Sequence, residues 1–201
     1  SSSYTVIPEP NDAVISADAM NVVYRGVDNP VSVSLPGVSN NNLKVSATGG
    51  TIIQNGSSFI IKAGKGDEMT INVGATLSSG KKINSSKKFR VKDIPAAQAS
   101  VRGEFGMVRM PKTSIGRAEI GAGLPDFVFD LKLKVTSFKV KVPGQLTVLV
   151  NGTGFSAAAK QAINKASRGD VITIFDIEAV IENNTSYKLK KVLPVSIEIS
   201  N

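Results

Sequence analysis

The sequence predicts a mostly β protein: an immunoglobulin-like β-sandwich over residues 1–95, followed over residues 96–201 by an α+β domain with one main helix. Three observations carry this prediction. Turn-forming residues recur about every ten positions through the first half. Short runs of alternating apolar and polar residues lie between these turns. The second half changes to longer alternating runs and a helical segment.

In the first half, turn signals divide the chain at Pro36-Gly37, Gly49-Gly50, Asn55-Gly56, Gly64 with Gly66-Asp67, and Ser79-Gly80. The runs between the turns place apolar residues on one face of each expected strand, namely Val31/Val33/Leu35, Leu43/Val45, Phe59/Ile61/Ala63, Met69/Ile71/Val73 and Phe89/Val91. Before the first run, Gly26 and the Asp28-Asn29-Pro30 cluster predict a further turn. This spacing is typical of a small antiparallel sandwich.

The boundary between the two domains is predicted within the segment Asp93-Ile94-Pro95-Ala96-Ala97-Gln98-Ala99. A proline follows the last strand of the sandwich, and small residues follow the proline. After them the pattern of the sequence changes.

The second half contains a long strand, or a bent pair of strands, over residues 127–142. Its apolar residues change parity: Phe127, Phe129, Leu131, Leu133 and Val135 hold one parity, and Phe138, Val140 and Val142 hold the other. Because a shift of one residue turns every side chain to the opposite face, we expect a bulge at Thr136-Ser137. The bulge would let Lys132, Lys134, Lys139 and Lys141 all point outward.

The remaining elements follow in chain order. We expect a strand at Leu146–Val150, a helix at about residues 156–167, and a strand at Val171–Val180. A turn at Asn183-Asn184-Thr185-Ser186 then leads through the basic segment Lys188–Lys191 to a final strand, Val195–Ile199.

The composition excludes several classes of site. The chain has 201 residues, a formal net charge of +8, and no cysteine or histidine. Catalysis by Ser–His–Asp or Cys–His groups and zinc sites built from His or Cys are therefore impossible. The 16 acidic residues are scattered and the basic residues are spread over both halves, while tryptophan is absent. We therefore expect no metal, no cofactor and no nucleic-acid partner.

Two patterns suggest enzymatic chemistry, and each has a simpler explanation. Gly152-Thr153-Gly154-Phe155-Ser156-Ala157 follows a strand and opens a helix, with Asp176 about 20 residues further on, as in dinucleotide-binding units. We favour an ordinary crossover in which Ser156 caps the helix, because only one strand–helix–strand unit is present. Asp176 and Glu178 are expected on the same side of a strand as Ile172 and Ile174. The strand would then be apolar at its start and solvated at its end, which favours two surface acids over a catalytic pair.

Two segments resemble the GldM/PorM family, periplasmic shaft proteins of the type IX secretion and gliding machinery. One is Tyr24-Arg25-Gly26-Val27-Asp28-Asn29-Pro30-Val31-Ser32-Val33-Ser34-Leu35-Pro36-Gly37-Val38. The other is Gly169-Asp170-Val171-Ile172-Thr173-Ile174-Phe175-Asp176-Ile177-Glu178-Ala179, with the closing Leu193-Pro194-Val195-Ser196-Ile197-Glu198-Ile199. The segments bracket nearly the whole chain, so the resemblance implies the last two periplasmic domains.

The resemblance implies a structural role without enzymatic activity. In this family a membrane helix works with an inner-membrane partner as a proton-driven motor, and a dimeric periplasmic shaft reaches toward a lipoprotein ring at the outer membrane. We therefore expect a periplasmic homodimer with residues 127–142 at or near the shared surface. The chain opens on Ser1-Ser2-Ser3 and has no apolar run long enough to span a membrane, so we expect the inner-membrane anchor to lie upstream.

The contact with the ring is expected on the second domain. The candidate residues are Arg109, Lys112, Arg117, Lys188, Lys190 and Lys191. Long basic side chains can steer an acidic partner, and the alternative is a solvated face that keeps the protein soluble. A periplasmic or cell-surface module that binds a peptide or a glycan is the competing function, and a dinucleotide-binding enzyme is the third.

Overall fold

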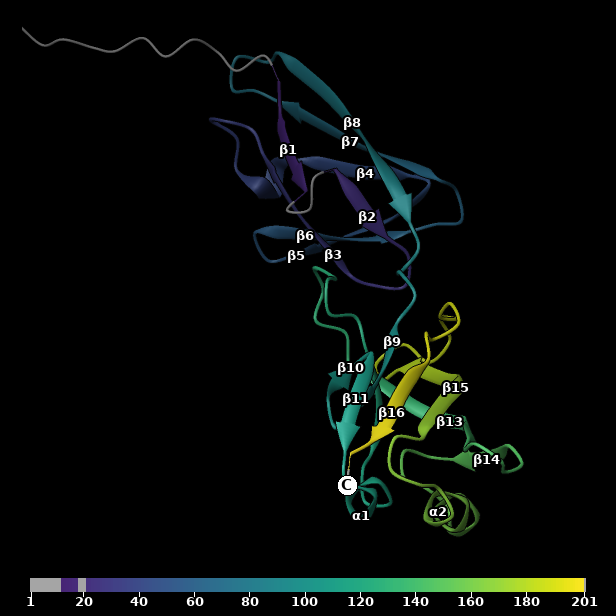
Figure 1. The fold of residues 1–201 in the computed structure, drawn as a ribbon. Coiled ribbons are helices and arrows are strands. Elements are labelled where there is room, and N and C mark those ends of the chain that lie inside the picture. The colour runs from purple at the N-terminus through teal and green to yellow at the C-terminus, as the bar shows by residue number, and fades with distance from the viewer. Residues whose placement is uncertain (1–11, 18–20, 201) are drawn as a thin grey trace, which may run out of the picture. The chain divides into compact units, whose positions relative to one another are not determined.

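A computed structural model describes residues 12–17 and 21–200 of the chain (Figure 1). The chain divides into two compact units, Ser1–Ile94 and Pro95–Asn201. Strands are the main regular secondary structure of both units, and one main helix is present among the described residues. The predicted fold class is therefore confirmed.

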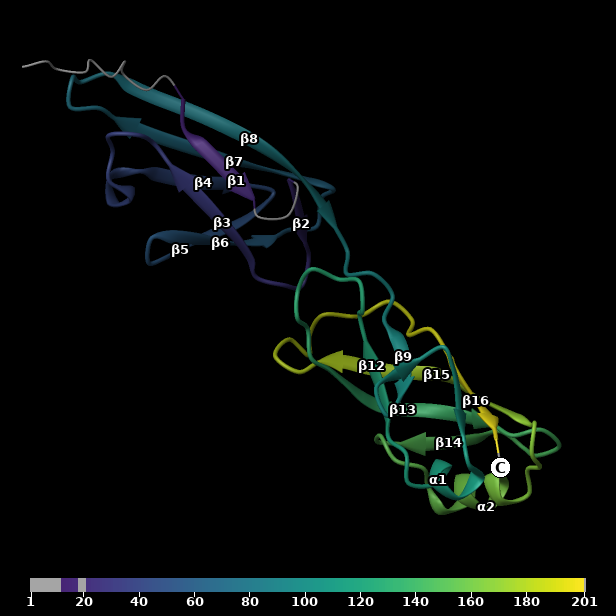
Figure 2. The ribbon, with the colours of Figure 1, turned by 60° about the vertical axis from the view of Figure 1, so that its left-hand side comes forward.

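The first unit consists of two four-stranded sheets packed face to face (Figure 2). One sheet has the order β1-β3-β6-β5, with strands β1 (Val14–Ala17), β3 (Asn29–Ser34), β6 (Ser58–Ala63) and β5 (Gly50–Asn55). The other has the order β2-β8-β7-β4, with strands β2 (Val22–Tyr24), β8 (Lys82–Lys92), β7 (Glu68–Thr76) and β4 (Lys44–Thr48). Neighbouring strands are antiparallel except β2 and β8, which are parallel. A single 3-10 turn, Asn40–Asn42, lies between β3 and β4.

The apolar residues that alternate in the sequence form the core of this sandwich. Val31, Phe59, Met69, Ile71 and Phe89 are all buried in one cluster between the two sheets. A smaller cluster, formed by Leu35, Ala75, Leu77 and Ile83, extends the core. The alternation thus places one face of each long strand inside, as period-two patterning requires.

The Tyr24–Asn29 connection is held by two polar side chains. Asn29 is 3% exposed; its Oδ1 accepts from the Tyr24 backbone N–H (2.8 Å), and its Nδ2 donates to the carbonyls of Tyr24, Val27 and Ile61. Arg25 donates to the carbonyls of residues 64, 65 and 66 and to the Asp93 carboxylate. The expected turn at Asp28-Asn29-Pro30 lies earlier than predicted, because Asn29 already pairs with Ile61 at the start of β3.

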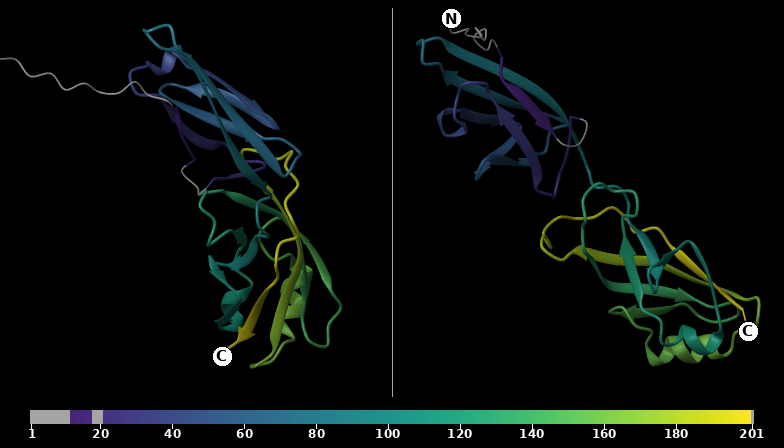
Figure 3. Two further views of the ribbon diagram at one scale, coloured as in Figure 1. Left: turned by 90° about the horizontal axis from the view of Figure 1, so that it is seen from above. Right: turned by 90° about the vertical axis from the view of Figure 1, so that its left-hand side faces the viewer.

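The second unit packs a five-stranded sheet against a three-stranded one (Figure 3). The larger sheet has the order β11-β16-β15-β13-β14, with strands β11 (Met107–Met110), β16 (Val195–Ile199), β15 (Val171–Ile181), β13 (Leu133–Lys141) and β14 (Val148–Asn151). The smaller sheet has the order β10-β9-β12, with strands β10 (Glu104–Phe105), β9 (Gln98–Val101) and β12 (Ile120–Gly123). The helices are α1 (Lys112–Ile115) and the longer α2 (Ala157–Asn164).

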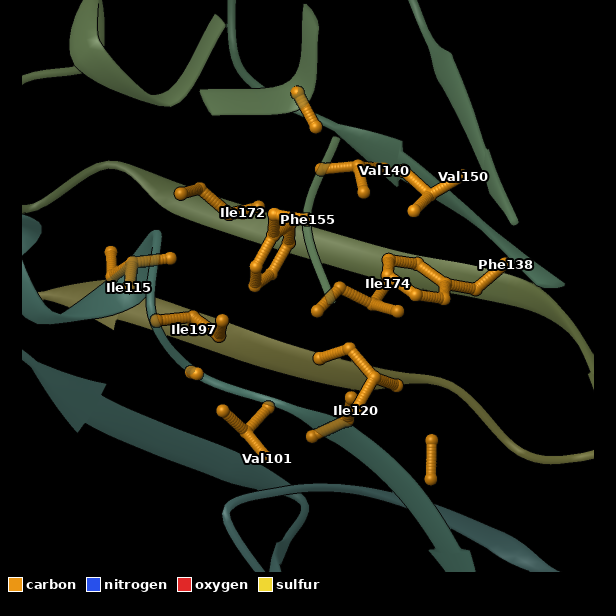
Figure 4. Packing of buried hydrophobic residues seen from close by; sticks show 14 of the residues in the cluster. Val101, Ile115, Ile120, Phe138, Val140, Val150, Phe155, Ile172, Ile174 and Ile197 are labelled. Carbon is orange, nitrogen blue, oxygen red and sulfur yellow. The ribbon is translucent and has the colours of Figure 1, made fainter. Parts of the chain in front are cut away.

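One apolar cluster fills the space between the two sheets and α2. Figure 4 shows Val101 and Ile120 of the smaller sheet facing Ile174 and Ile197 of the larger one. Phe138 and Phe155 meet edge to face with their ring centroids 5.8 Å apart. The aromatic pair thereby joins the chain just before α2 to the centre of the sheet.

The predicted bulge in β13 is confirmed. The pairing with β15 shifts register on both sides of Ser137, so Val135 and Phe138 are both buried although they differ in parity. A compensating irregularity lies on β15, where Asp176 adopts a φ of +46°. This second irregularity overturns one expectation: Ile177 faces the core, and Asp176 and Glu178 lie on the opposite side from Ile172 and Ile174.

Two predicted boundaries are wrong. The strand expected over residues 127–142 begins only at Leu133, because Leu133 pairs with Ile181, where β15 ends and the chain turns. Among residues 12–17 and 21–200, no strand pairs with residues 127–132. The helix expected at residues 156–167 ends at Asn164, and its cap is as predicted: Ser156 Oγ accepts from the Ala159 backbone N–H.

Candidate interaction surfaces

The first group of predicted contact residues surrounds α1, and two of its three members have internal partners. Arg109 on β11 forms an ion pair with Glu198 on β16, with 2.8 Å between Nε and Oε2. The Lys112 ammonium donates to the carbonyls of Asn164 (3.2 Å) and Ala166 (3.0 Å), at the C-terminal end of α2. A cation at that position satisfies terminal carbonyls and suits the helix dipole. Arg117 is exposed.

The second group, Lys188, Lys190 and Lys191, is exposed on the segment between β15 and β16. Lys191 lies close enough to Asp176 to contribute to the lowered pKa of that carboxyl, although the hydrogen bond from Lys139 is the larger cause. This group precedes the first residue of β16, whereas Arg109 pairs with Glu198 near its last residue. The two groups therefore lie toward opposite ends of β16 and do not form one patch.

The sequence analysis missed an exposed apolar surface on the β13–β14 hairpin. Leu146 is 88% exposed and Leu149 is 60% exposed. Strand β14 forms the edge of the five-stranded sheet, and no described strand pairs with its outer side. The signal in the sequence is a lack of charge, because no charged residue occurs between Lys141 and Lys160. Edge strands without charge, proline or a bulge are open to pairing with another strand.

The backbone of β14 has a defined free side. The Gly152 N–H donates to the Thr136 carbonyl (2.7 Å), and pairing alternates along an antiparallel ladder. Val148 and Val150 therefore bond to β13, while the N–H and C=O of Leu149 point away from the sheet. The hairpin turn is stabilised by a bond from the Gln145 N–H to the Val142 carbonyl and by Lys141, whose ammonium donates to the Gln145 carbonyl.

The dinucleotide interpretation of the Gly152–Ala157 segment does not fit the structure. The Thr153 carbonyl accepts from the Ile120 N–H, and Gly154 bridges to Glu119. The loop backbone is thus used to join β14 to β12. Strands β14 and β15 flank β13 and are both antiparallel to it, so the strands before and after α2 are not neighbours as a dinucleotide-binding unit requires.

Two further searches concern the described residues only. No group of three or more acidic side chains within residues 12–17 and 21–200 is placed to hold a metal ion. Over the same ranges, no helix has both the length and the apolar character needed to cross a membrane.

Several solved structures resemble the chain at low identity. The fibronectin(III)-like modules of Clostridium thermocellum CbhA are 16% identical, with coverage of 93% of this chain and 94% of theirs and a TM-score of 0.29. Domains 4 and 5 of the S-layer protein SbsC are 14% identical, with coverage of 96% and 100% and a TM-score of 0.36. No curated protein matches the sequence.

Two family models match the sequence, one for each unit. The model described as the GldM third domain matches residues 12–92, and the model described as the GldM C-terminal domain matches residues 95–200. Together they span almost the whole chain. The chain therefore belongs to the GldM family of type IX secretion and gliding motility components.

Proposed function

We propose that this chain is the distal part of a periplasmic shaft that links an inner-membrane motor to an outer-membrane lipoprotein ring. The observation that carries the proposal is the match of both units, in order, to the third and C-terminal domains of GldM. In this proposal the chain has no enzymatic activity and transmits force from the motor to the ring. The membrane anchor and the contact with the motor partner belong to a part of the protein outside these 201 residues.

We further propose that the shaft is a homodimer and that β14 contributes to the shared surface. The outward backbone groups of Leu149 offer main-chain hydrogen bonds to a second strand, and its exposed side chain offers apolar contact. A second copy supplies an identical uncharged edge, so two β14 strands can pair about a two-fold axis. This surface adjoins β13 and so keeps the dimer contact at the region of residues 127–142.

The second unit is proposed to contact the ring. Arg117, Lys188 and Lys190 are exposed, and cations on irregular segments raise the association rate with an acidic partner. Lys112 is removed from the proposed contact set because it binds the end of α2. Arg109 is removed as well, because its guanidinium is paired with Glu198.

The test is binding of purified outer-membrane ring components to the 201-residue chain. We expect binding to be lost on deletion of residues 95–201 and to weaken, most clearly at low salt, in the double variant Arg117→Glu/Lys190→Glu. The matched control is Lys65→Glu/Lys82→Glu, which makes the same change in net charge on exposed side chains of the first unit. Binding that survives deletion of the second unit would refute the proposed arrangement.

A further inference from the structure

The outer face of the β2-β8-β7-β4 sheet is polar along its three longer strands. Side chains alternate in and out along each of them, and the outward positions carry only glycine, hydroxyl, amide and charged residues. They are Lys44, Ser46 and Thr48 on β4; Glu68, Thr70, Asn72, Gly74 and Thr76 on β7; and Lys82, Asn84, Ser86, Lys88, Arg90 and Lys92 on β8. We call this surface the polar face; Figure 1 labels the three strands that carry it.

The strand register arranges the polar face in rows. Ser46, Asn72 and Ser86 lie side by side across three strands, and Lys44, Gly74 and Asn84 form the next row. Adjacent rows are about 7 Å apart, because two residues of a strand advance by that distance. Within the described chain, Ser46, Asn72 and Ser86 make no side-chain hydrogen bond, so their donors and acceptors are directed to solvent.

Gly74 lets the Asn84 side chain lie close against the backbone at the centre of the polar face. A Cβ at this position would lie 3.2 Å from Asn84 Oδ1 and 3.9 Å from the Lys44 Cβ. Its φ is not positive, so the backbone does not require glycine there. Glycine within a strand often marks the close approach of a ligand or another backbone. Here the Asn84 amide lies over Gly74, so a larger side chain at position 74 would have to displace that amide.

The charges of the polar face favour an anionic ligand. The polar face carries five cationic side chains and one carboxylate. That carboxylate, Glu68, lies 3.8 Å from the Lys88 ammonium. A protein partner would need apolar and aromatic side chains for the dry centre of an interface, and the polar face has none. Single-stranded nucleic acid would need aromatic platforms for its bases, which are also absent from it.

From these features we infer that the polar face binds cell-wall peptidoglycan, through the hydroxyl and acetamido groups of the glycan and the carboxylates of its peptides. Asn72, Asn84 and the serines supply donors and acceptors for the sugar groups, while Lys44 beside Gly74 and Lys82 in the adjacent row supply cations for a carboxylate. The inference rests on the periplasmic location that the proposed function includes. Binding of the polar face to peptidoglycan would hold the shaft to the cell wall at a site separate from the ring contact.

The test is co-sedimentation of the 201-residue chain with purified peptidoglycan sacculi at about 150 mM salt. Gly74→Val displaces the Asn84 amide, suits a strand and leaves the charge unchanged, so we expect it to weaken binding about tenfold, as the loss of one hydrogen-bonded subsite predicts. Thr51→Val places a valine at an exposed position of β5 on the other sheet and should bind as wild type.

A second pair of variants separates specific binding from general charge attraction. Lys44→Gln/Lys82→Gln should weaken binding several-fold, whereas Lys132→Gln/Lys134→Gln, an equal charge change in the second unit, should leave it unchanged. Polyglutamate, which offers carboxylates without sugars, should not compete at equal carboxylate concentration. Normal binding by Gly74→Val, equal losses in both charge variants, or full competition by polyglutamate would each overturn the inference.

The two proposals fail separately. Gly74→Val should bind the ring components as wild type does, because its change lies in the first unit. A chain that binds the ring but not sacculi refutes only the peptidoglycan inference. A chain that binds sacculi but not the ring refutes only the proposed ring contact.

Discussion

Replacement of Asn29 by alanine tests the explanation of the Tyr24–Asn29 connection. The side chain is 3% exposed and bonds four backbone groups, so water cannot replace it without opening the sandwich. Loss of Oδ1 leaves the Tyr24 N–H without this acceptor, and loss of Nδ2 removes a donor from three carbonyls. An unsatisfied buried donor costs about 1–3 kcal/mol, and the lost donor bonds add about 1 kcal/mol.

We therefore expect Asn29→Ala to lower the free energy of unfolding of the first unit by about 3 kcal/mol. For a unit of this size the corresponding fall in Tm is roughly 12–24 °C. Urea unfolding followed by circular dichroism measures the loss, and hydrogen exchange assigns it to the first unit. Asn42→Ala, at an exposed position of the 3-10 turn, should change stability by less than about 0.5 kcal/mol. Equal, small effects of the two variants would refute the account of Asn29.

Three further predictions concern the second unit. Lys112→Ala should lower its unfolding free energy by about 1 kcal/mol because two carbonyls at the end of α2 lose a charged donor; Arg117→Ala is the control, and equal urea midpoints would contradict the capping role. Leu149→Lys should shift the light-scattering mass from dimer toward monomer with a stability change below about 0.5 kcal/mol, and an unaffected dimer would remove β14 from the shared surface. The hydrogen bond from Lys139 lowers the pKa of Asp176 below its ordinary value of 3.8, so its stabilisation is present above pH 3.8 and is lost as pH falls through the lowered pKa. Asp176→Asn keeps the left-handed geometry and should lack this loss in urea titrations from pH 5 to 2; identical pH profiles would contradict it.

The sequence was sufficient to predict the strands that bury one face in the core. The alternation of Val31 and Val33 with serines fits one strand orientation, with the valines inward. The parity change at Thr136-Ser137 likewise requires a bulge, because any other register would expose the core. It was insufficient for β5, whose Thr51-Ile52-Ile53-Gln54 run does not alternate and lies between two turns. It also could not locate the bulge on β15, because the irregularity at Asp176 depends on the bulge in the partner strand.

Surface chemistry was harder to predict than the fold. Lys112 looked like a free cation in the sequence, and only the packing of α1 beside α2 gives it two carbonyl partners. Leu149 shows the opposite case: it lies in a strand that the sequence predicts, and its side chain is exposed. Whether β14 is an edge depends on the order of strands in the sheet, and that order joins residues far apart in the sequence.

Photo-crosslinking in living cells tests the central claim, that the second unit faces the outer-membrane ring, most directly. A photoreactive amino acid replaces Lys190 or Arg117 in the full-length protein, and Lys65 of the first unit serves as the control position. The account predicts crosslinks from position 190 or 117 to an outer-membrane lipoprotein of the ring, and none from position 65. Crosslinks to the ring from position 65 alone would contradict it.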